Sequence, residues 1–222
     1  MGLYAKVISD KNEIYLKVRT LIDHKVTPYQ EVIIADIFNQ GKTLIMDNEV
    51  QTSYVDVIPY HEALIHPYKP LEHERMLILG CGEGCSIDVS IRRGWKHIDA
   101  VDIDGQALEM IDTHLSDWNN HVYKRQNEYN LLVDDGLSVL KCTPDQYYSY
   151  VVFDLTSQAI QDKKDLWISE INRVLMHNGL LTWQDGNQLS PSYLDETVRH
   201  YFKTTPTYKT MLGWRYGSCP KI

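Results

Sequence analysis

The pattern of apolar positions changes about a quarter of the way along the chain. Before residue 55, β-branched and apolar residues alternate or form short runs at Ile14–Leu21, Glu31–Ile37 and Thr43–Met46. Asn, Asp and Gly residues between these runs favour tight turns. We therefore predict a small antiparallel β-hairpin domain over residues 1–55. A sheet this thin needs to pack on another part of the chain to be stable.

From residue 75 onward, short apolar runs alternate with amphipathic stretches. The helical stretches carry apolar residues at helical spacing, as at Leu108, Ile111 and Leu115. This alternation is typical of a parallel sheet with helices on both faces. Residues 56–68 predict a connecting helix, so we assign residues 56–222 to a Rossmann-like, nucleoside-cofactor-binding catalytic domain. The predicted strands of this domain are Met76–Leu79, Ile98–Val101, Leu131–Val133, Tyr147–Phe153 and Leu180–Trp183, with a terminal strand pair after a helix at 192–202.

Composition narrows the class of protein. The 222 residues are 43% hydrophobic and 23% charged, which is ordinary for a globular protein. No apolar run approaches the length of a membrane span, and the N-terminus lacks the layout of a secretion signal. Four scattered cysteines without paired spacing predict neither a disulfide framework nor a metal site, and favour the cytoplasm. The net charge of −8 disfavours nucleic acid as a partner and suits a cationic small substrate.

A glycine-rich turn follows the first strand of the larger domain. The segment Gly80-Cys81-Gly82-Glu83-Gly84 predicts a strand–turn–helix in which the backbone approaches a ligand closely. Twenty residues past Gly82, the next predicted strand ends on Asp102, where a carboxylate grips ribose hydroxyls in nucleoside-binding folds. Glu83 is unusual, because a turn built for pyrophosphate would not aim a negative charge at its own ligand. The turn therefore predicts a nucleoside ligand without phosphates.

Acidic residues follow four successive apolar runs or turns: Glu83, Asp102, Asp135 and Asp154. Helix capping explains one such acid better than four. We assign Asp102 to the ribose diol, Asp135 with Gly136 to the adenine edge, and Asp154 to the chemistry. Acids suit the positive charge of a sulfonium, so S-adenosylmethionine or a relative is favoured over NAD. Glu83 would repel the carboxylate of S-adenosylmethionine and pair with the amine of its decarboxylated form.

Several segments together resemble the polyamine aminopropyltransferases, the spermidine synthase family. The resemblance runs from about residue 15 to about residue 190. It rests on Thr27-Pro28-Tyr29-Gln30, Leu44 to Gln51, Tyr60-His61-Glu62, Gly80 to Cys85 and Asp135-Gly136. It implies a Rossmann-like class I methyltransferase fold, with a seven-stranded, mostly parallel sheet and a small N-terminal antiparallel β domain. The implied reaction moves the aminopropyl group of decarboxylated S-adenosylmethionine, without a metal, to a small putrescine-like polyamine and releases methylthioadenosine. Relatives of this kind are homodimers or homotetramers.

The resemblance also implies roles for individual residues. Tyr60 would line the channel for the aminopropyl group and the amine, and Asp154 would help to deprotonate the attacking amine. Amine contacts would also come from Ser157, Gln188 and Trp214. The decarboxylated co-substrate would be held by Gln30, Gln51, His61, Gly80, Gly82, Glu83, Asp102, Ile103, Asp135 and Gly136.

The chain departs from the family pattern in the half of the site that would hold the amine. Ser157 stands where the family has a second Asp, and the glycine-rich gating loop is shortened into residues 159–164. Residues 212–215 replace a C-terminal Pro-Thr-Tyr-Pro-x-Gly motif. The donor half is thus preserved and the acceptor half is not. Two alternatives stay open: a class I methyltransferase that uses S-adenosylmethionine itself, and a non-catalytic relative that binds a nucleoside or a partner subunit.

Overall fold

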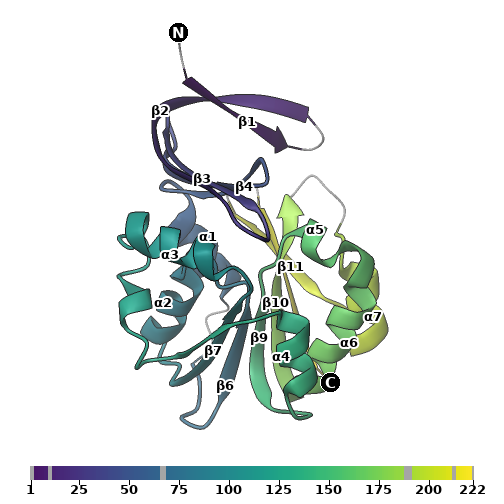
Figure 1. Ribbon diagram of the computed structural model, residues 1–222. Helices are drawn as coiled ribbons and strands as arrows, with labels where there is room; N and C mark the ends of the chain where they lie inside the picture. Colours follow the sequence, from purple (N-terminus) through teal and green to yellow (C-terminus); the bar gives the residue numbers. More distant parts are fainter. Residues whose placement is uncertain (1–2, 10–11, 66–68, 188–191, 212–213, 222) are drawn as a thin grey trace.

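The computed structural model describes residues 3–9, 12–65, 69–187, 192–211 and 214–221. Its N-terminal part is an antiparallel sheet in which each strand pairs with the next along the chain. In Figure 1 this sheet lies above the larger part of the molecule. Its strands are β1 (Leu3–Ser9), β2 (Asn12–Val26), β3 (Glu31–Ile37), β4 (Gly41–Met46) and β5 (Glu49–Ser53).

The second sheet has seven strands in the order β11-β12-β10-β9-β6-β7-β8. The five strands from β10 to β8 are parallel, and β12 and β11 are added in antiparallel fashion. The chain first builds outward from β6 to β8 and then returns to the other side of β6 with β9, so the strand order reverses between β6 and β9. The strands are β6 (Arg75–Leu79), β7 (His97–Asp102), β8 (Asn130–Val133), β9 (Tyr148–Phe153), β10 (Leu175–Asn187), β11 (Thr207–Met211) and β12 (Trp214–Pro220).

The central strands are apolar on both faces because helices cover both. Successive strand residues point to opposite faces, so Met76 and Ile78 of β6 join one apolar core, and Leu77 and Leu79 join the other. The first core includes residues of α1 to α3, and the second includes residues of α4, α6 and α7 (Figure 1). The helices are α1 (Val57–Leu64), α2 (Cys85–Arg92), α3 (Gly105–His114), α4 (Gly136–Cys142), α5 (Ser157–Ile160), α6 (Lys164–Val174) and α7 (Asp195–Phe202), with single 3₁₀ turns η1 (Val122–Lys124) and η2 (Gln161–Lys163).

This architecture confirms the predicted pair of sheets, and it differs from the prediction in two N-terminal strands and at the ends of several elements. Strands β1 and β5 were not predicted, and β2 is longer than the apolar run at Ile14–Leu21 because its pairing with β1 and β3 continues past it. Helix α1 is shorter than residues 56–68 and ends at Leu64. The domain division at residues 55 and 56 stays a prediction. No helix in the described part of the chain is long and apolar enough to cross a membrane.

Candidate active site

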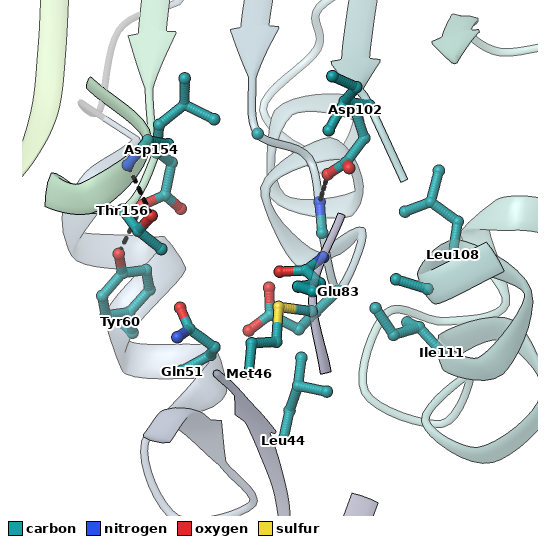
Figure 2. A pocket seen from close by; sticks show the side chains of 17 residues that line it. Leu44, Met46, Gln51, Tyr60, Glu83, Asp102, Leu108, Ile111, Asp154 and Thr156 are labelled. Atoms are coloured by element: carbon teal, nitrogen blue, oxygen red, sulfur yellow. Dashed lines mark hydrogen bonds between the residues drawn. The ribbon is translucent and has the colours of Figure 1, made fainter. Parts of the chain in front are cut away.

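A pocket lies where the strand order reverses, at the carboxyl ends of β6, β7 and β9, which is where open α/β sheets bind their ligands. Its empty space is about 810 Å³, part of it open to solvent. Figure 2 shows its walls: the N-terminal sheet contributes from below, α3 from one side and α1 from the other. The lining residues are Gln30, Leu44, Met46, Gln51, Tyr60, Gly80, Gly82, Glu83, Asp102, Ile103, Ala107, Leu108, Ile111, Asp154, Leu155, Thr156 and Ala159.

The glycine turn between β6 and α2 lines part of the pocket with main-chain atoms of Gly80 and Gly82. Gly80 has a φ of +81°, and a Cβ there would lie 2.3 Å from the carbonyl oxygen of Asp154. Only glycine fits that contact, because any side chain would push the turn away from the end of β9. The amide of Gly82 donates to Asp102 Oδ2 at 3.0 Å, as Figure 2 shows. The carboxylate predicted to take the ribose diol therefore also holds the turn.

Two side chains from the segment after α3 support the same turn from the side. The Tyr123 hydroxyl donates to the carbonyl of Gly82, and Asn119 Nδ2 donates to the carbonyl of Glu83 at 2.7 Å. Asn119 is fully buried, and its own Oδ1 accepts from the amide of Val122 at 3.1 Å. The carbonyl of Gly82 and the carbonyl of Glu83 itself are thus both hydrogen-bonded.

A buried carboxylate joins the N-terminal sheet to the pocket. Asp104 Oδ2 accepts from the Thr27 hydroxyl at 2.7 Å and from Gln30 Nε2 at 3.0 Å. Its Oδ1 accepts from the amide of Ala107 and so caps α3. The amide of Asp104 donates to Asp102 Oδ1 at 3.0 Å. The loop that carries Gln30 is therefore held in register with the end of β7.

On the opposite wall, Tyr60 of α1 donates to Asp154 Oδ1 at 2.6 Å (Figure 2). The ring of Tyr60 packs edge-on against His61, with centroids 4.9 Å apart. His61 Nδ1 lies 2.7 Å from the carbonyl of Val57, which can only accept, so the proton sits on Nδ1. Burial lowers the pKa of His61, so this ring is neutral at neutral pH.

Two acids that line the pocket, Glu83 and Asp154, have raised pKa values. The pKa of Glu83 is raised to about 7, mainly by burial and to a smaller extent by the carboxylates of Asp102 and Asp56, while its own backbone amide opposes the rise. Burial raises the pKa of Asp154 to about 6, against opposition from His61 and the Tyr60 hydrogen bond. Burial also raises the pKa of Asp102. A cation entering the pocket favours the ionised form of each acid.

The structure brings together most of the residues predicted for the donor half and the two predicted to be catalytic. The donor residues that line the pocket are Gln30, Gln51, Gly80, Gly82, Glu83, Asp102 and Ile103, and Tyr60 and Asp154 line it as well. His61 lies behind Tyr60 and is 1% exposed. Asp135 caps α4 by accepting from the amide and hydroxyl of Ser138, and neither Asp135 nor Gly136 is among the lining residues.

Most of the side chains predicted to contact the amine are not among those that the structure describes. Gln188 lies outside the described residues, and the side chains of Ser157 and Trp214 are likewise not described. Their roles stay predictions.

Sequence reasoning missed several residues that shape the pocket. The apolar wall of Leu108 and Ile111 was predicted only as the packing face of a helix, although its position directly after β7 is a usable signal. Asp104, two residues past Asp102, carried the signal of a helix N-cap. No sequence pattern marked Asn119 and Tyr123, because they lie in a segment without helical or strand periodicity that contacts the turn only in the folded chain. Within the described residues, no group of three His, Cys, Asp or Glu side chains is placed to hold a metal ion.

Fold and site together define a Rossmann-like α/β protein whose pocket at the carboxyl ends of the strands is lined by several acids. Residues 57–219 match the family model of the spermine/spermidine synthase domain. The chain therefore belongs to the spermine/spermidine synthase family, which confirms the resemblance drawn from its motifs.

The chain is also similar to proteins that are named polyamine aminopropyltransferases. The chain is 33% identical to a polyamine aminopropyltransferase of Sulfolobus acidocaldarius over 85% of its length, and 30% identical to one of Pyrobaculum calidifontis over 81%. It spans only 63% and 65% of those two proteins.

Solved structures support the fold. A spermidine synthase in complex with the transition-state analogue AdoDATO superposes with a TM-score of 0.87 at 14% identity, covering 99% of this chain and 80% of that one. The spermidine synthase of Thermotoga maritima superposes with a TM-score of 0.84, also at 14% identity, covering 99% of this chain and 79% of the other. These matches confirm the predicted fold class.

Proposed function

We propose that the chain is an aminopropyltransferase that uses decarboxylated S-adenosylmethionine and a small polyamine. One observation carries the proposal: Glu83, Asp102 and Asp154 line the same pocket, and none of the three forms an ion pair with another side chain in the described part of the chain. Three acids around one pocket suit a ligand that bears positive charge and no phosphate. Family membership and the AdoDATO complex of a structural neighbour agree with this reading.

The donor half suits each part of the proposed co-substrate. Asp102 at the end of β7 is placed for the ribose, as the carboxylate is in related nucleoside-binding folds. Leu108, Ile111 and Leu44 offer an apolar surface for a purine ring. Glu83 would pair with the terminal aminium of the decarboxylated tail. The carboxylate of intact S-adenosylmethionine at that place would face Glu83 and be repelled.

Asp154 is the residue best placed to act on the amine. In the proposed reaction the amine nitrogen attacks the methylene carbon beside the sulfonium, the carbon–sulfur bond breaks, and methylthioadenosine leaves with the bond's electron pair. The amine gives up a proton, for which Asp154 is the acceptor. A free amine with a pKa near 10.4, that of lysine, is mostly protonated at neutral pH, so this help matters. Tyr60 would hold Asp154 in place through the 2.6 Å hydrogen bond.

Product analysis tests the proposal directly. The protein is incubated with either decarboxylated S-adenosylmethionine or S-adenosylmethionine and a panel of diamines and longer polyamines, and nucleoside products are separated by chromatography. We expect methylthioadenosine together with an aminopropylated amine from the decarboxylated compound only. Adenosylhomocysteine would instead identify a methyltransferase, and binding without turnover would identify a non-catalytic relative.

Two further expectations accompany the proposal. A putrescine-like acceptor is proposed from the family resemblance, and the panel of amines decides its length. A cytoplasmic location and a homodimeric or homotetrameric assembly stay predictions.

A further inference from the structure

We propose that Asn119 and Tyr123 are positioning residues that set the place of the Glu83 carboxylate and thereby the preference for a decarboxylated tail. This inference rests on the proposed function, because it concerns how the same pocket selects its co-substrate. Neither residue lines the pocket. Both act through the backbone of the glycine turn.

Hydrogen bonds hold both of the peptide groups that flank the Glu83 Cα. The peptide before it is bonded at its carbonyl, and the peptide after it is bonded at both its carbonyl and its amide. A trans peptide is planar, with its carbonyl and amide pointing in opposite directions. The Tyr123 hydroxyl bonds the Gly82 carbonyl, so the Glu83 amide must point away from Tyr123. Its orientation agrees with the contribution of that amide to lowering the pKa of the Glu83 carboxyl.

The next peptide is held as firmly. Asn119 bonds the Glu83 carbonyl at 2.7 Å, and the Gly84 amide at the other end of the same peptide donates to the Cys81 carbonyl at 2.7 Å. With both peptides held, the direction of the Cα–Cβ bond of Glu83 is determined. The carboxylate is then the part of the residue left to meet a ligand.

Close packing keeps the supporting segment against the turn. A Cβ on Gly84 would lie 2.7 Å from Val122 Cγ1, 3.0 Å from Tyr123 Cε2 and 3.1 Å from Asn119 Nδ2. Tyr123 is 8% exposed and Asn119 is fully buried, so water does not compete freely for their hydrogen bonds. The segment therefore acts as a fixed support behind the turn.

The length of the acidic side chain explains why support is needed. Glutamate has one more rotatable bond than aspartate, so its charge already sweeps a larger volume, and movement of the backbone would widen that volume further. Repulsion of a carboxylate and attraction of an aminium both depend on that charge staying at the tail of the ligand. Loosening the turn would reduce the discrimination more than it reduces the binding of the nucleoside.

The test uses two variants, each with a matched control on the same segment. Tyr123→Phe removes only the hydroxyl that bonds the turn; Tyr129→Phe removes a buried hydroxyl that donates to the Val122 carbonyl at 3.4 Å instead. Asn119→Asp replaces the amide donor with an oxygen and adds a charge; Asn120→Asp adds the same charge at the neighbouring exposed position. Thermal melting checks that all four variants fold.

Calorimetric titration measures three ligands: decarboxylated S-adenosylmethionine, S-adenosylmethionine, and methylthioadenosine, which has no charged tail. In Tyr123→Phe and Asn119→Asp we expect the preference for the decarboxylated compound, taken as the dissociation constant of S-adenosylmethionine divided by that of decarboxylated S-adenosylmethionine, to fall at least about fivefold, the scale of one hydrogen bond. Methylthioadenosine should change by less than about twofold, and the controls should keep the wild-type ratio. An unchanged ratio, or an equal loss for all three ligands, would overturn the inference.

A second readout separates this inference from the proposed function. In the ligand-free protein, carboxyl-carbon NMR follows the titration of Glu83 after its assignment with Glu83→Gln. Tyr123→Phe should raise the pKa of Glu83, because the Glu83 amide is no longer held facing its own carboxylate, and Tyr129→Phe should not. If the wild-type protein shows no preference for the decarboxylated compound, the proposed function fails. If the titration of Glu83 does not move in Tyr123→Phe, the support of the turn by Tyr123 fails.

Discussion

The residues proposed for the donor half of this pocket and those proposed for its acceptor half come from different kinds of segment. Asp102 ends strand β7, and Glu83 lies in the turn that follows the neighbouring parallel strand β6, where the Gly82 amide bonds the Asp102 carboxylate. Asp154 shares that origin at the end of β9, yet the residues predicted to complete the amine site come from segments after β9 and β10. Sheet ends preserve geometry when side chains change, whereas loops keep it only through particular side chains. The comparison explains how one half retains the family pattern while the other departs from it.

The largest effect is expected from replacing Asp154, the acid that we place between the donor half and the acceptor half. Asp154→Asn should lower kcat by at least about a hundredfold, because an amide cannot take the proton of the attacking amine. Binding of methylthioadenosine should persist, since that ligand uses the donor half. Asp134→Asn is the matched control: Asp134 also follows a strand, is exposed, and is not among the lining residues. Near-native turnover of Asp154→Asn would remove the residue from its proposed role.

A smaller effect is expected from neutralising the donor half. Glu83→Gln should weaken decarboxylated S-adenosylmethionine about tenfold, the scale of one charged hydrogen bond, and leave methylthioadenosine within about twofold. The wild-type affinity should rise with pH through about 7, because only ionised Glu83 attracts the aminium and its pKa is about 7. This rise should shrink in the variant. Titration calorimetry between pH 6 and 8 measures both; equal losses for both ligands would place Glu83 outside tail recognition.

The smallest effect concerns the Tyr60 hydroxyl, which bonds Asp154, the proposed proton acceptor. Tyr60→Phe should lower kcat about threefold at pH 8, because Asp154 would lose the one hydrogen bond from Tyr60 that orients its carboxylate. The Tyr60 hydrogen bond lowers the pKa of Asp154, so its loss should move the acid limb of the pH–rate profile to higher pH. Tyr148→Phe is the matched control, since its hydroxyl also donates to a carboxylate, that of Asp99, away from the pocket. An acid limb that stays in place would show that Tyr60 does not tune Asp154.

Much of the fold and of the donor half could be predicted because it depends on local patterns. Apolar runs mark the central strands, and an acid directly after each run marks the ligand edge of a parallel sheet. Asn119 and Tyr123 could not be predicted, because they reach the glycine turn from a stretch without helical or strand periodicity. Asp135 illustrates the converse: its position after β8 suggested a ligand contact, and its carboxylate caps α4. An acid after a strand thus has two common uses, and only the three-dimensional packing distinguishes them.

The close approach of Gly80 to the carbonyl of Asp154 has a consequence for changing the specificity of this pocket. Main-chain atoms on both sides set the spacing between the glycine turn and Asp154, so we expect exchange of the loops beyond β9 and β10 to leave that spacing intact. Under the proposed function, new acceptors would then be accessible through loop replacement alone. Grafting those loops from a relative onto this scaffold is therefore a rational route to altered amine specificity.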